Sequence, residues 1–341
     1  MDSEMRALVV DRPGAAAVRR VPRPEPEPGE VLVRVGAAGI CGSDLEVLEG
    51  RRPSAYVRYP LIPGHEWAGT VEAVGPGVEV EEGTVVVAEG FRACGDCARC
   101  REGRTNLCTA EYAETGFTHP GAFADYLCVP ARLVHRLPAG TDLAAAAVLE
   151  PAACVAQGLL EAELRPGLSA AVVGSGTLGL LAVALLSLVS PARLALVGSR
   201  GPRLELGTAL GATDTWNVRE GRLPEPGFDL VFEAAGTVDG ARTATELARR
   251  GGTVVLEGIS GRPGGVSADD IVLGHLRVQG IFGASRNAWR WVTELFATGL
   301  LDTRPLVSHT FPLEDHDKAF ATLADREGDA LKVQLTPEPA R

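Results

Sequence analysis

Four cysteines crowded into one short segment are the strongest chemical signal in this 341-residue chain. They follow the spacing C-x2-C-x2-C-x7-C, at Cys94, Cys97, Cys100 and Cys108. Four thiolates complete the tetrahedral coordination that zinc prefers and leave no open position, which is typical of a structural site. An iron–sulfur cluster can use the same four ligands and stays the alternative at this point. We expect the lobe at about residues 90–110 to fold only with its metal bound.

A second candidate metal site is spread along the same part of the chain. Cys41 stands in Gly-Ile-Cys-Gly-Ser-Asp, and His65 and Glu66 stand in Pro-Gly-His-Glu-Trp. Cysteine and histidine suit zinc, and three protein ligands leave a position for water or a substrate oxygen. Because Cys41 and His65 are far apart in the sequence, their spacing alone does not join them into one site.

A glycine motif indicates a nucleotide site. Its residues are Gly174, Gly176, Thr177, Leu178 and Gly179, within a G-x-G-x-x-G pattern. The chain has 41 glycines, so the pattern alone is weak evidence. Its context is stronger, because a buried strand ends at Val173 and an apolar helix begins near Thr177. In that context the glycines permit a tight turn, a close approach to a pyrophosphate and close packing of helix on strand. The helix N-terminus then faces the phosphates.

The next strand favours one cofactor over another. It ends in Gly198-Ser199-Arg200, with Arg203 beyond, and carries no carboxylate to bind a ribose 2′-hydroxyl. Ser199 with Arg200 or Arg203 can bind a 2′-phosphate instead. The pattern therefore favours NADP(H) over NAD(H). The alternative is that these arginines are surface charges and that NAD, or both cofactors, are used.

These candidate residues lie in two stretches of different texture. Up to about residue 152, short Val-rich strands such as 31–35, 68–75 and 83–88 follow one another, with a proline-rich connector at 22–28. From about residue 153, strands and helices alternate, which predicts an α/β fold with a doubly wound parallel sheet. The expected strands are 169–173, 193–197, 228–232, 253–257 and 277–282, and the expected helices are 177–188, 201–210 and 238–250. A further helix containing Trp289 is expected after Gly283.

Taken together, these motifs resemble the zinc-dependent medium-chain alcohol dehydrogenases. The resemblance is carried, in the same order, by Cys41-Gly-Ser-Asp44, Gly64-His-Glu66, the four cysteines, Glu150-Pro151 and the glycine motif. It is closest to the sorbitol/threonine dehydrogenase branch, which includes polyol and aminocyclitol dehydrogenases. The resemblance implies a GroES-like β-rich catalytic domain from residues 1–152 and 284–341. The inserted residues 153–283 would form the Rossmann dinucleotide-binding domain, with the active site in the cleft between the two.

The resemblance also implies roles for single residues. The ligands of a catalytic zinc would be Cys41, His65, Glu66 and Glu150, the last binding directly or through water. The alternative for Glu150 is an exposed acid at the start of a helix. Asp44 would orient His65, which fixes the tautomer of the imidazole ring. Ser43 would take the substrate proton, although a simple turn residue is the alternative.

One position departs from the family pattern. Relatives commonly carry a histidine of the proton path five residues after the zinc cysteine, where this chain has Glu46. Glu46 would relay protons, pair with a cationic substrate in the pocket, or lie in solvent as a loop acid. The sequence leaves these three interpretations open.

Composition excludes several classes of partner. The chain has 33 basic and 44 acidic residues, a net charge of −11, which argues against nucleic acid or an anionic membrane. No apolar run approaches the ~20 residues of a membrane span. The N-terminus lacks the pattern of a secretory signal. Seven cysteines, an odd number, suit metal binding in a reducing cytoplasm better than a disulfide scaffold.

The expected activity follows from the resemblance. It is a zinc-dependent, NAD(P)-linked dehydrogenase with two zinc ions per chain, which transfers a hydride between the cofactor and a secondary alcohol or its ketone. The substrate would be a polyol, sugar, cyclitol or aminocyclitol, and the assembly a homodimer or homotetramer. One alternative is a non-catalytic NADP-binding, redox-sensing protein. Another is a zinc-independent enone reductase, which both metal motifs oppose.

Overall fold

The computed structural model describes residues 3–325 and 328–337. Its internal contacts divide the chain into two compact units, Met1–Glu150 with Ser285–Arg341, and Pro151–Ala284. The second unit is inserted into the sequence of the first. Within the described ranges, no helix is both long and apolar enough to cross a membrane.

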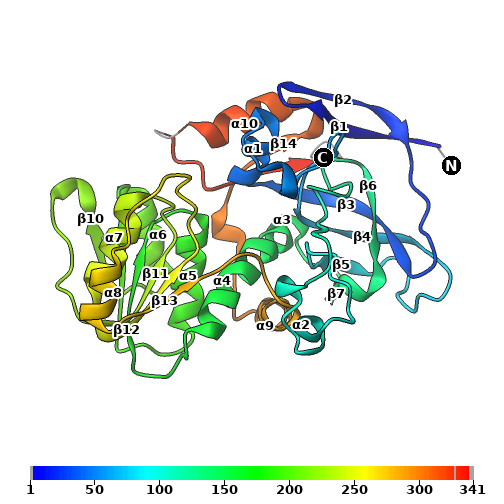
Figure 1. Ribbon diagram of the computed structural model, residues 1–341. Coiled ribbons are helices and arrows are strands. Elements are labelled where there is room, and N and C mark those ends of the chain that lie inside the picture. Colours follow the sequence, from blue (N-terminus) through cyan, green and yellow to red (C-terminus); the bar gives the residue numbers. More distant parts are fainter. Residues whose placement is uncertain (1–2, 326–327, 338–341) are drawn as a thin grey trace. The chain divides into compact units, whose positions relative to one another are not determined.

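The unit Pro151–Ala284 is built on a parallel sheet, shown in Figure 1. Its six strands pair in the order β10-β9-β8-β11-β12-β13, and every pairing is parallel. The strands are β8 (Ser169–Val173), β9 (Arg193–Gly198), β10 (Asp214–Asn217), β11 (Phe228–Glu233), β12 (Ala248–Leu256) and β13 (Arg277–Gly280). Strand order reverses between β8 and β11, and such a reversal opens a crevice at the carboxyl ends of the strands. The predicted α/β fold with a doubly wound sheet is confirmed.

The helices of this unit lie against its sheet. They are α5 (Thr177–Ser187), α6 (Gly201–Ala209), α7 (Val238–Leu247) and α8 (Ala268–Gly274), preceded by α4 (Leu149–Glu161). Helix α5 is apolar on all sides and contains Leu180, Leu181 and Leu185, which are fully buried. A helix of that composition belongs in a core, because no face of it suits water.

In this unit, three boundaries differ from the predictions by two residues or more. Helix α7 ends at Leu247 rather than 250, and β12 begins at Ala248 because this stretch pairs with β11. Arg249 Nε donates to Asp229 Oδ1 at 2.9 Å, which holds the early part of β12 against β11. Strand β13 ends at Gly280, two residues before the predicted end at 282. Helix α8 was not predicted, although Ser267 caps it in the ordinary way.

The unit Met1–Glu150 with Ser285–Arg341 is mainly antiparallel. Its larger sheet has the order β14-β15-β3-β4-β5-β7, with β6 also paired to β3, and β1 and β2 form a separate hairpin. The strands are β1 (Glu4–Arg12), β2 (Ala15–Pro22), β3 (Glu30–Ile40), β4 (Glu66–Val74), β5 (Val85–Ala88), β6 (Tyr126–Pro130), β7 (Val134–Leu137), β14 (Val307–Pro312) and β15 (Lys332–Thr336). The helices are α1 (Gly42–Glu49), α2 (Ala98–Arg101), α3 (Leu143–Ala147), α9 (Arg286–Ala297) and α10 (His316–Ala324).

Strand β3 organises this unit. Val31, Val33 and Val35 are buried in one hydrophobic cluster, and the short strand predicted at 31–35 is part of a longer strand. Near the end of β3, Gly39 pairs with Glu66 of β4, and Ile40 pairs with Val333 of β15. Both neighbours run antiparallel to β3. The end of β3 therefore meets the beginnings of β4 and β15.

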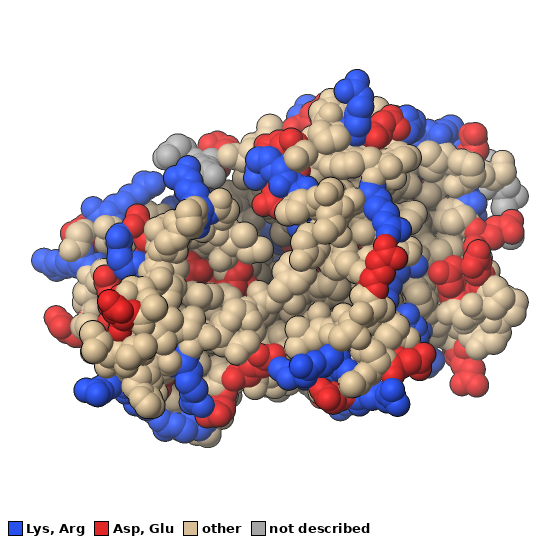
Figure 2. Space-filling view, viewed as in Figure 1, with Lys and Arg blue, Asp and Glu red and all other residues tan. Residues whose placement is uncertain are grey.

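The molecular surface carries charges of both signs. Figure 2 shows lysine and arginine interspersed with aspartate and glutamate on the visible face. No extended basic surface is seen on that face, which agrees with the net charge of −11.

Candidate metal centres and cofactor site

Cys41, His65 and Glu66 converge although they are distant in sequence. One ligand atom of each, a thiol sulfur, a ring nitrogen and a carboxylate oxygen, lies within 4.8 Å of the other two. Cys41 follows the last residue of β3, and Glu66 is the first residue of β4, so the antiparallel pairing of these strands joins them. His65 and Glu66 are 5% and 1% exposed. Spacing did not link these residues, but the sheet does.

Asp44 fixes the local geometry of this group. Cys41 is the N-cap of α1, and its backbone N–H donates to Asp44 Oδ2 at 2.9 Å. The other oxygen, Oδ1, lies 3.6 Å from His65 Nδ1, and Asp44 is fully buried. Because Nδ1 of His65 is turned to Asp44, Nε2 is the nitrogen left for a metal.

The donor set fits zinc. Sulfur, imidazole nitrogen and carboxylate oxygen are the ligands that this metal takes in proteins, and three of them leave an open position. Burial lowers the pKa of His65, but the charge and hydrogen bond of Asp44, the hydrogen bond with Cys41 and the charge of Glu150 together raise the pKa well above its usual value. A proton therefore competes with a metal for His65.

Lys332 lies against Glu66, a contact that sequence analysis missed. Its Nζ donates to Glu66 Oε2 at 2.5 Å and to Oε1 at 2.7 Å, and both side chains are buried. Gly39 makes room for this pair, because a Cβ there would lie 2.2 Å from Glu66 Oε2. The available signal was a lysine at the head of the apolar segment Lys332–Thr336, in a chain with only two lysines.

The other residues predicted around this site lie at different places. Glu150, partly buried at the start of α4, is outside the three-residue ligand group, although its charge acts on His65 and Lys332. Ser43 is partly buried in the first turn of α1. Glu46, on the same helix, lies 3.8 Å from the guanidinium groups of Arg51 and Arg52. The predicted roles of Glu150, Ser43 and Glu46 remain predictions.

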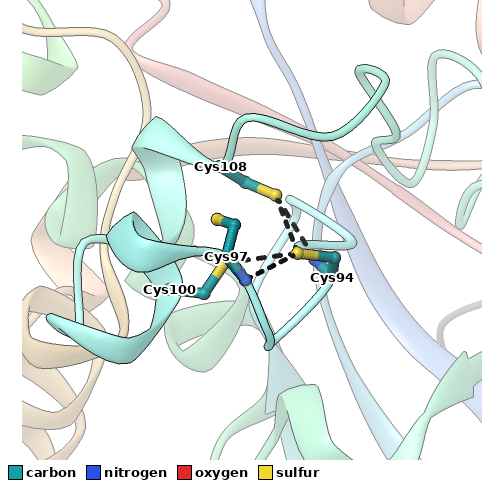
Figure 3. Close-up of side chains that lie close together, drawn as sticks. All are labelled: Cys94, Cys97, Cys100 and Cys108. Carbon is teal, nitrogen blue, oxygen red and sulfur yellow. Dashed lines mark hydrogen bonds between the residues drawn. The ribbon is translucent and has the colours of Figure 1, made fainter.

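The four cysteines of the lobe gather as their spacing predicts. Their sulfur atoms lie within 4.8 Å of one another, and Figure 3 shows the side chains close together. Cys94 Sγ is 3.5 Å from Cys108 Sγ and 3.9 Å from Cys100 Sγ. Tetrahedral zinc with bonds of about 2.3 Å requires sulfur–sulfur distances of about 3.8 Å. The sulfur atoms are therefore spaced for zinc.

Backbone N–H groups favour the thiolate form at Cys94 and Cys97, whereas burial raises the pKa of the Cys100 thiol to about 12. The N–H of Cys97 lies 3.4 Å from Cys94 Sγ, and the N–H of Cys94 lies 3.4 Å from Cys108 Sγ. Hydrogen bonds from the backbone of Thr109 and Cys100 lower the pKa of the Cys97 thiol to about 5. A thiolate is the form that binds metal.

The lobe is tied to α9 by a buried acid. Arg286 Nε donates to Glu89 Oε1 at 2.8 Å, and Glu89 is 2% exposed. The N–H of Arg286 also donates to Thr105 Oγ1 at 3.0 Å, within the segment that carries the cysteines. These contacts connect residues that lie about 180 positions apart in the sequence.

The glycine motif lines a cavity of about 640 Å³ in the unit Pro151–Ala284. Gly174 follows β8 with φ +113°, and a Cβ there would lie 2.6 Å from the backbone nitrogen of Ala235, which follows β11. Gly176 caps α5, and a Cβ on Gly179 would lie 1.8 Å from the carbonyl oxygen of Gly174. The cavity thus lies at the reversal of strand order, beside a helix N-terminus.

Cationic side chains line part of this cavity. Its lining includes Gly174, Gly176, Ser199, Arg200 and Arg203, whereas Thr177, Leu178 and Gly179 form the first turn of α5. Arg222 also lines it, which sequence analysis missed because Arg222 lies in a loop far from the glycine motif. Three guanidinium groups at one cavity suit a phosphate.

Comparison with known proteins agrees with this geometry. Residues 27–139 match the family model of the alcohol dehydrogenase GroES-like domain, and residues 177–298 match that of the zinc-binding dehydrogenases. An L-threonine 3-dehydrogenase of Bacillus velezensis is 34% identical over 99% of this chain and 100% of its own length.

Solved structures agree as well. A protein described as a zinc-binding dehydrogenase from Sinorhizobium meliloti, bound to NADP, has a TM-score of 0.91 with 30% identity, over 98% of this chain and 100% of its own. An alcohol dehydrogenase from Escherichia coli CFT073, in complex with NADH, has a TM-score of 0.88 with 27% identity, over 98% and 100%.

Proposed function

Because the chain belongs to the zinc-dependent medium-chain alcohol dehydrogenases, in the threonine/polyol branch, we propose that it oxidises a secondary alcohol of a polyol, sugar, cyclitol or aminocyclitol, or reduces the matching ketone. The observation that carries this proposal is the convergence of Cys41, His65 and Glu66. Relatives of this chain from several Bacillus species are named L-threonine 3-dehydrogenases, so a hydroxyl beside an amino-bearing carbon lies within the proposed range.

The Cys41/His65/Glu66 group, called the open site below, and the residues around it would have different roles in the reaction. Cys41, His65 and Glu66 would hold the metal, with Glu150 binding it directly or through water. The chemistry supplied by a zinc bound there is Lewis-acid activation of an alcohol. Asp44 holds His65 in the orientation that presents Nε2. Ser43 takes the proton of the hydroxyl group, and Glu46 occupies the position from which the proton is passed on.

We propose NADP(H) as the preferred cofactor and hydride carrier. Support comes from Ser199, Arg200, Arg203 and Arg222 at the cavity and from the NADP-bound structure that is similar to this chain. A similar structure with NADH shows that the fold accepts either cofactor. Comparison of kcat/KM for NADP+ and NAD+ tests the preference, and a strong preference for NAD+ would overturn it.

Further proposals concern zinc content, domain roles and assembly. We propose two zinc ions per chain, one at each group of ligands. Residues 1–152 with 284–341 would form the catalytic domain, and 153–283 the dinucleotide-binding domain. The odd count of seven cysteines favours metal binding in a reducing cytoplasm over a disulfide scaffold. Strand β13 lies at the edge of its sheet, where a second copy of the chain can pair in a homodimer or homotetramer.

The decisive experiment is a substrate screen on protein of measured zinc content. Polyols, aminocyclitols and simple secondary alcohols are offered with NADP+ and with NAD+. We expect reduction of the cofactor with at least one class. Protein that carries two zinc ions per chain and reduces neither cofactor with any alcohol would contradict the proposal.

A further inference from the structure

A buried ionic cluster lies beside the open metal site and takes no part in the mechanism above. It consists of Arg52, Tyr112, Glu114 and Phe117. The side chains of Arg52 and Glu114 are 10% and 8% exposed, and the guanidinium lies 3.8 Å from the Glu114 carboxylate. The hydroxyl group of Tyr112 donates a hydrogen bond to the Glu114 carboxylate. Charged side chains are rarely buried in a protein interior unless they are paired, because burial of a charge costs free energy.

Phe117 connects this cluster to the metal site. The His65 ring lies 4.7 Å from the Phe117 ring, centroid to centroid, and the Arg52 guanidinium lies 3.8 Å from the same Phe117 centroid. His65, Asp44 and Glu150 are all close enough to act electrostatically on Glu114. The cluster is therefore a neighbour of the groups that would surround a bound substrate.

The buried Glu114 carboxylate accepts a hydrogen bond from Tyr112 and, among the described residues, has a single cation, Arg52, near it. Arg52 is the nearest cation, but at 3.8 Å it is beyond hydrogen-bond distance. Arg52 is also shared with Glu46 at 3.8 Å, and it rests on Phe117. Burial raises the pKa of Glu114 to about 7, although His65 and Arg52 oppose this. A cation brought by a ligand would gain a direct, charge-assisted hydrogen bond here.

The excess of negative charge around Arg52 indicates which group a ligand would place here. Arg52 is shared by Glu114 and Glu46, and Arg51 is shared by Glu46 and Glu49, so three acids face two guanidinium groups. An added ammonium group improves this balance, whereas an added carboxylate must compete with both acids for Arg52. Glu46 is one-third exposed and Cys41 is partly exposed, so this side of the site reaches the solvent.

We propose that Glu114, positioned by Tyr112 and Arg52, binds the ammonium group of an amino alcohol whose neighbouring hydroxyl is oxidised at the Cys41/His65/Glu66 site. This inference rests on the proposed function and narrows its substrate class to secondary alcohols that carry a protonated amine. Glu114 is the residue that discriminates them from neutral polyols. Glu46, considered for that role on sequence grounds, contributes through Arg52.

Binding to the zinc-loaded full chain tests this without requiring turnover. The probes are 1-amino-2-propanol, 1,2-propanediol and 3-hydroxybutyrate, which differ in the charge beside a secondary hydroxyl. We expect calorimetry to show that the amine binds at least about tenfold more tightly than the diol. In Glu114→Gln the amine weakens by about tenfold or more while the diol is unchanged. Glu111→Gln is the matched control, because Glu111 lies in the same loop with its side chain 81% exposed.

Several results would overturn the proposal. These are equal weakening of amine and diol in Glu114→Gln, no preference for the amine in the unaltered chain, or tighter binding of 3-hydroxybutyrate than of the amine. If Glu114→Gln does not fold, Glu114→Asp retains the charge and must weaken the amine alone, by a smaller factor. Oxidation of amine and diol with equal kcat/KM would defeat this inference and leave the proposed dehydrogenase activity standing. If no alcohol is oxidised but the amine still binds more tightly than the diol, the proposed dehydrogenase activity is defeated and this inference about binding stands.

Discussion

The two candidate metal sites bring their ligands together in opposite ways. Cys94, Cys97, Cys100 and Cys108 come from one segment, and the groups that support their sulfur atoms include backbone N–H groups of the same segment. Cys41, His65 and Glu66 lie near the ends of β3 and β4 and are surrounded by charged side chains of other segments. A closed site is thus complete in its own loop, whereas an open site depends on the surrounding fold.

The difference has a chemical consequence. In the lobe, four thiolates would fill the coordination of a bound metal, so the protein would gain only stability from it. In the open site, Asp44 and Lys332 set the orientation and charge of two ligands, His65 and Glu66. Residues far away in the sequence can therefore adjust the open site without changing its ligands. The following substitutions separate stability from reactivity on this basis.

The largest effect is expected in the lobe. Cys97→Ser removes one of four ligands and opens the coordination, so the lobe loses its zinc and its fold. We expect the free energy of unfolding of the zinc-loaded protein to fall by more than about 5 kcal/mol. Denaturant titration and zinc analysis measure this. Cys128→Ala, outside both ligand groups, must keep its zinc content; an equal loss of zinc there would show that the lobe is not the site.

The next largest effect is expected at the open site, and in activity rather than stability. Cys41→Ser removes a ligand that no neighbouring side chain replaces, and we expect turnover to fall by about a thousandfold or more, about 4 kcal/mol in the barrier. Binding of the dinucleotide, measured by fluorescence titration, is expected to persist because the glycine motif is untouched. Full turnover in this variant would contradict the zinc assignment.

The sequence specified the lobe and the nucleotide motif more completely than the open site. Spacing sufficed for the cysteines because their geometry is local, and the glycines between Gly174 and Gly179 stand in a regular strand–turn–helix unit. Cys41 and His65 needed the resemblance to a family, because only the pairing of β3 with β4 joins them.

Charges contributed by distant strands and loops were beyond prediction. Lys332 reaches Glu66 only because β15 pairs with β3 after nearly the whole chain has been traversed. Arg52 and Glu114 are separated by a long stretch of sequence that folds back on itself, and each alone resembles a surface charge. The prediction that the helix extends to residue 250 was wrong for a similar reason. The chain after Leu247 pairs with β11, and this pairing outweighs the local helical pattern.

The third prediction concerns the buried ion pair of the open site. Lys332→Met keeps the volume of the side chain but leaves the buried Glu66 carboxylate without its cation. We expect the metal-free protein to lose about 3 kcal/mol of stability, and zinc to restore part of this by taking the place of the lost charge. Lys318→Met is the matched control, because Lys318 pairs with Asp315 at the surface and such pairs contribute about 1 kcal/mol or less. Equal losses in the two variants would show that the pair with Glu66 has no special weight.

The smallest effect is a pH dependence that separates the two sites. The pKa of His65 is raised in the folded, metal-free protein, so its charged form adds stability at low pH that is lost as the pH rises through that pKa. Zinc needs the neutral ring, and the stabilisation by zinc at the open site must therefore increase with pH, by at most about 1.4 kcal/mol per pH unit for this one proton. The increase continues until the pH reaches the folded pKa of His65, which lies well above the usual value of about 6.5, and then levels off. Thermal unfolding with and without zinc, compared between the unaltered chain and Asp44→Asn, measures it. Removal of the Asp44 charge lowers the pKa of His65, so the stabilisation by zinc levels off at a lower pH; an unchanged profile would mean that protons on the thiols, shared by both sites, control metal binding.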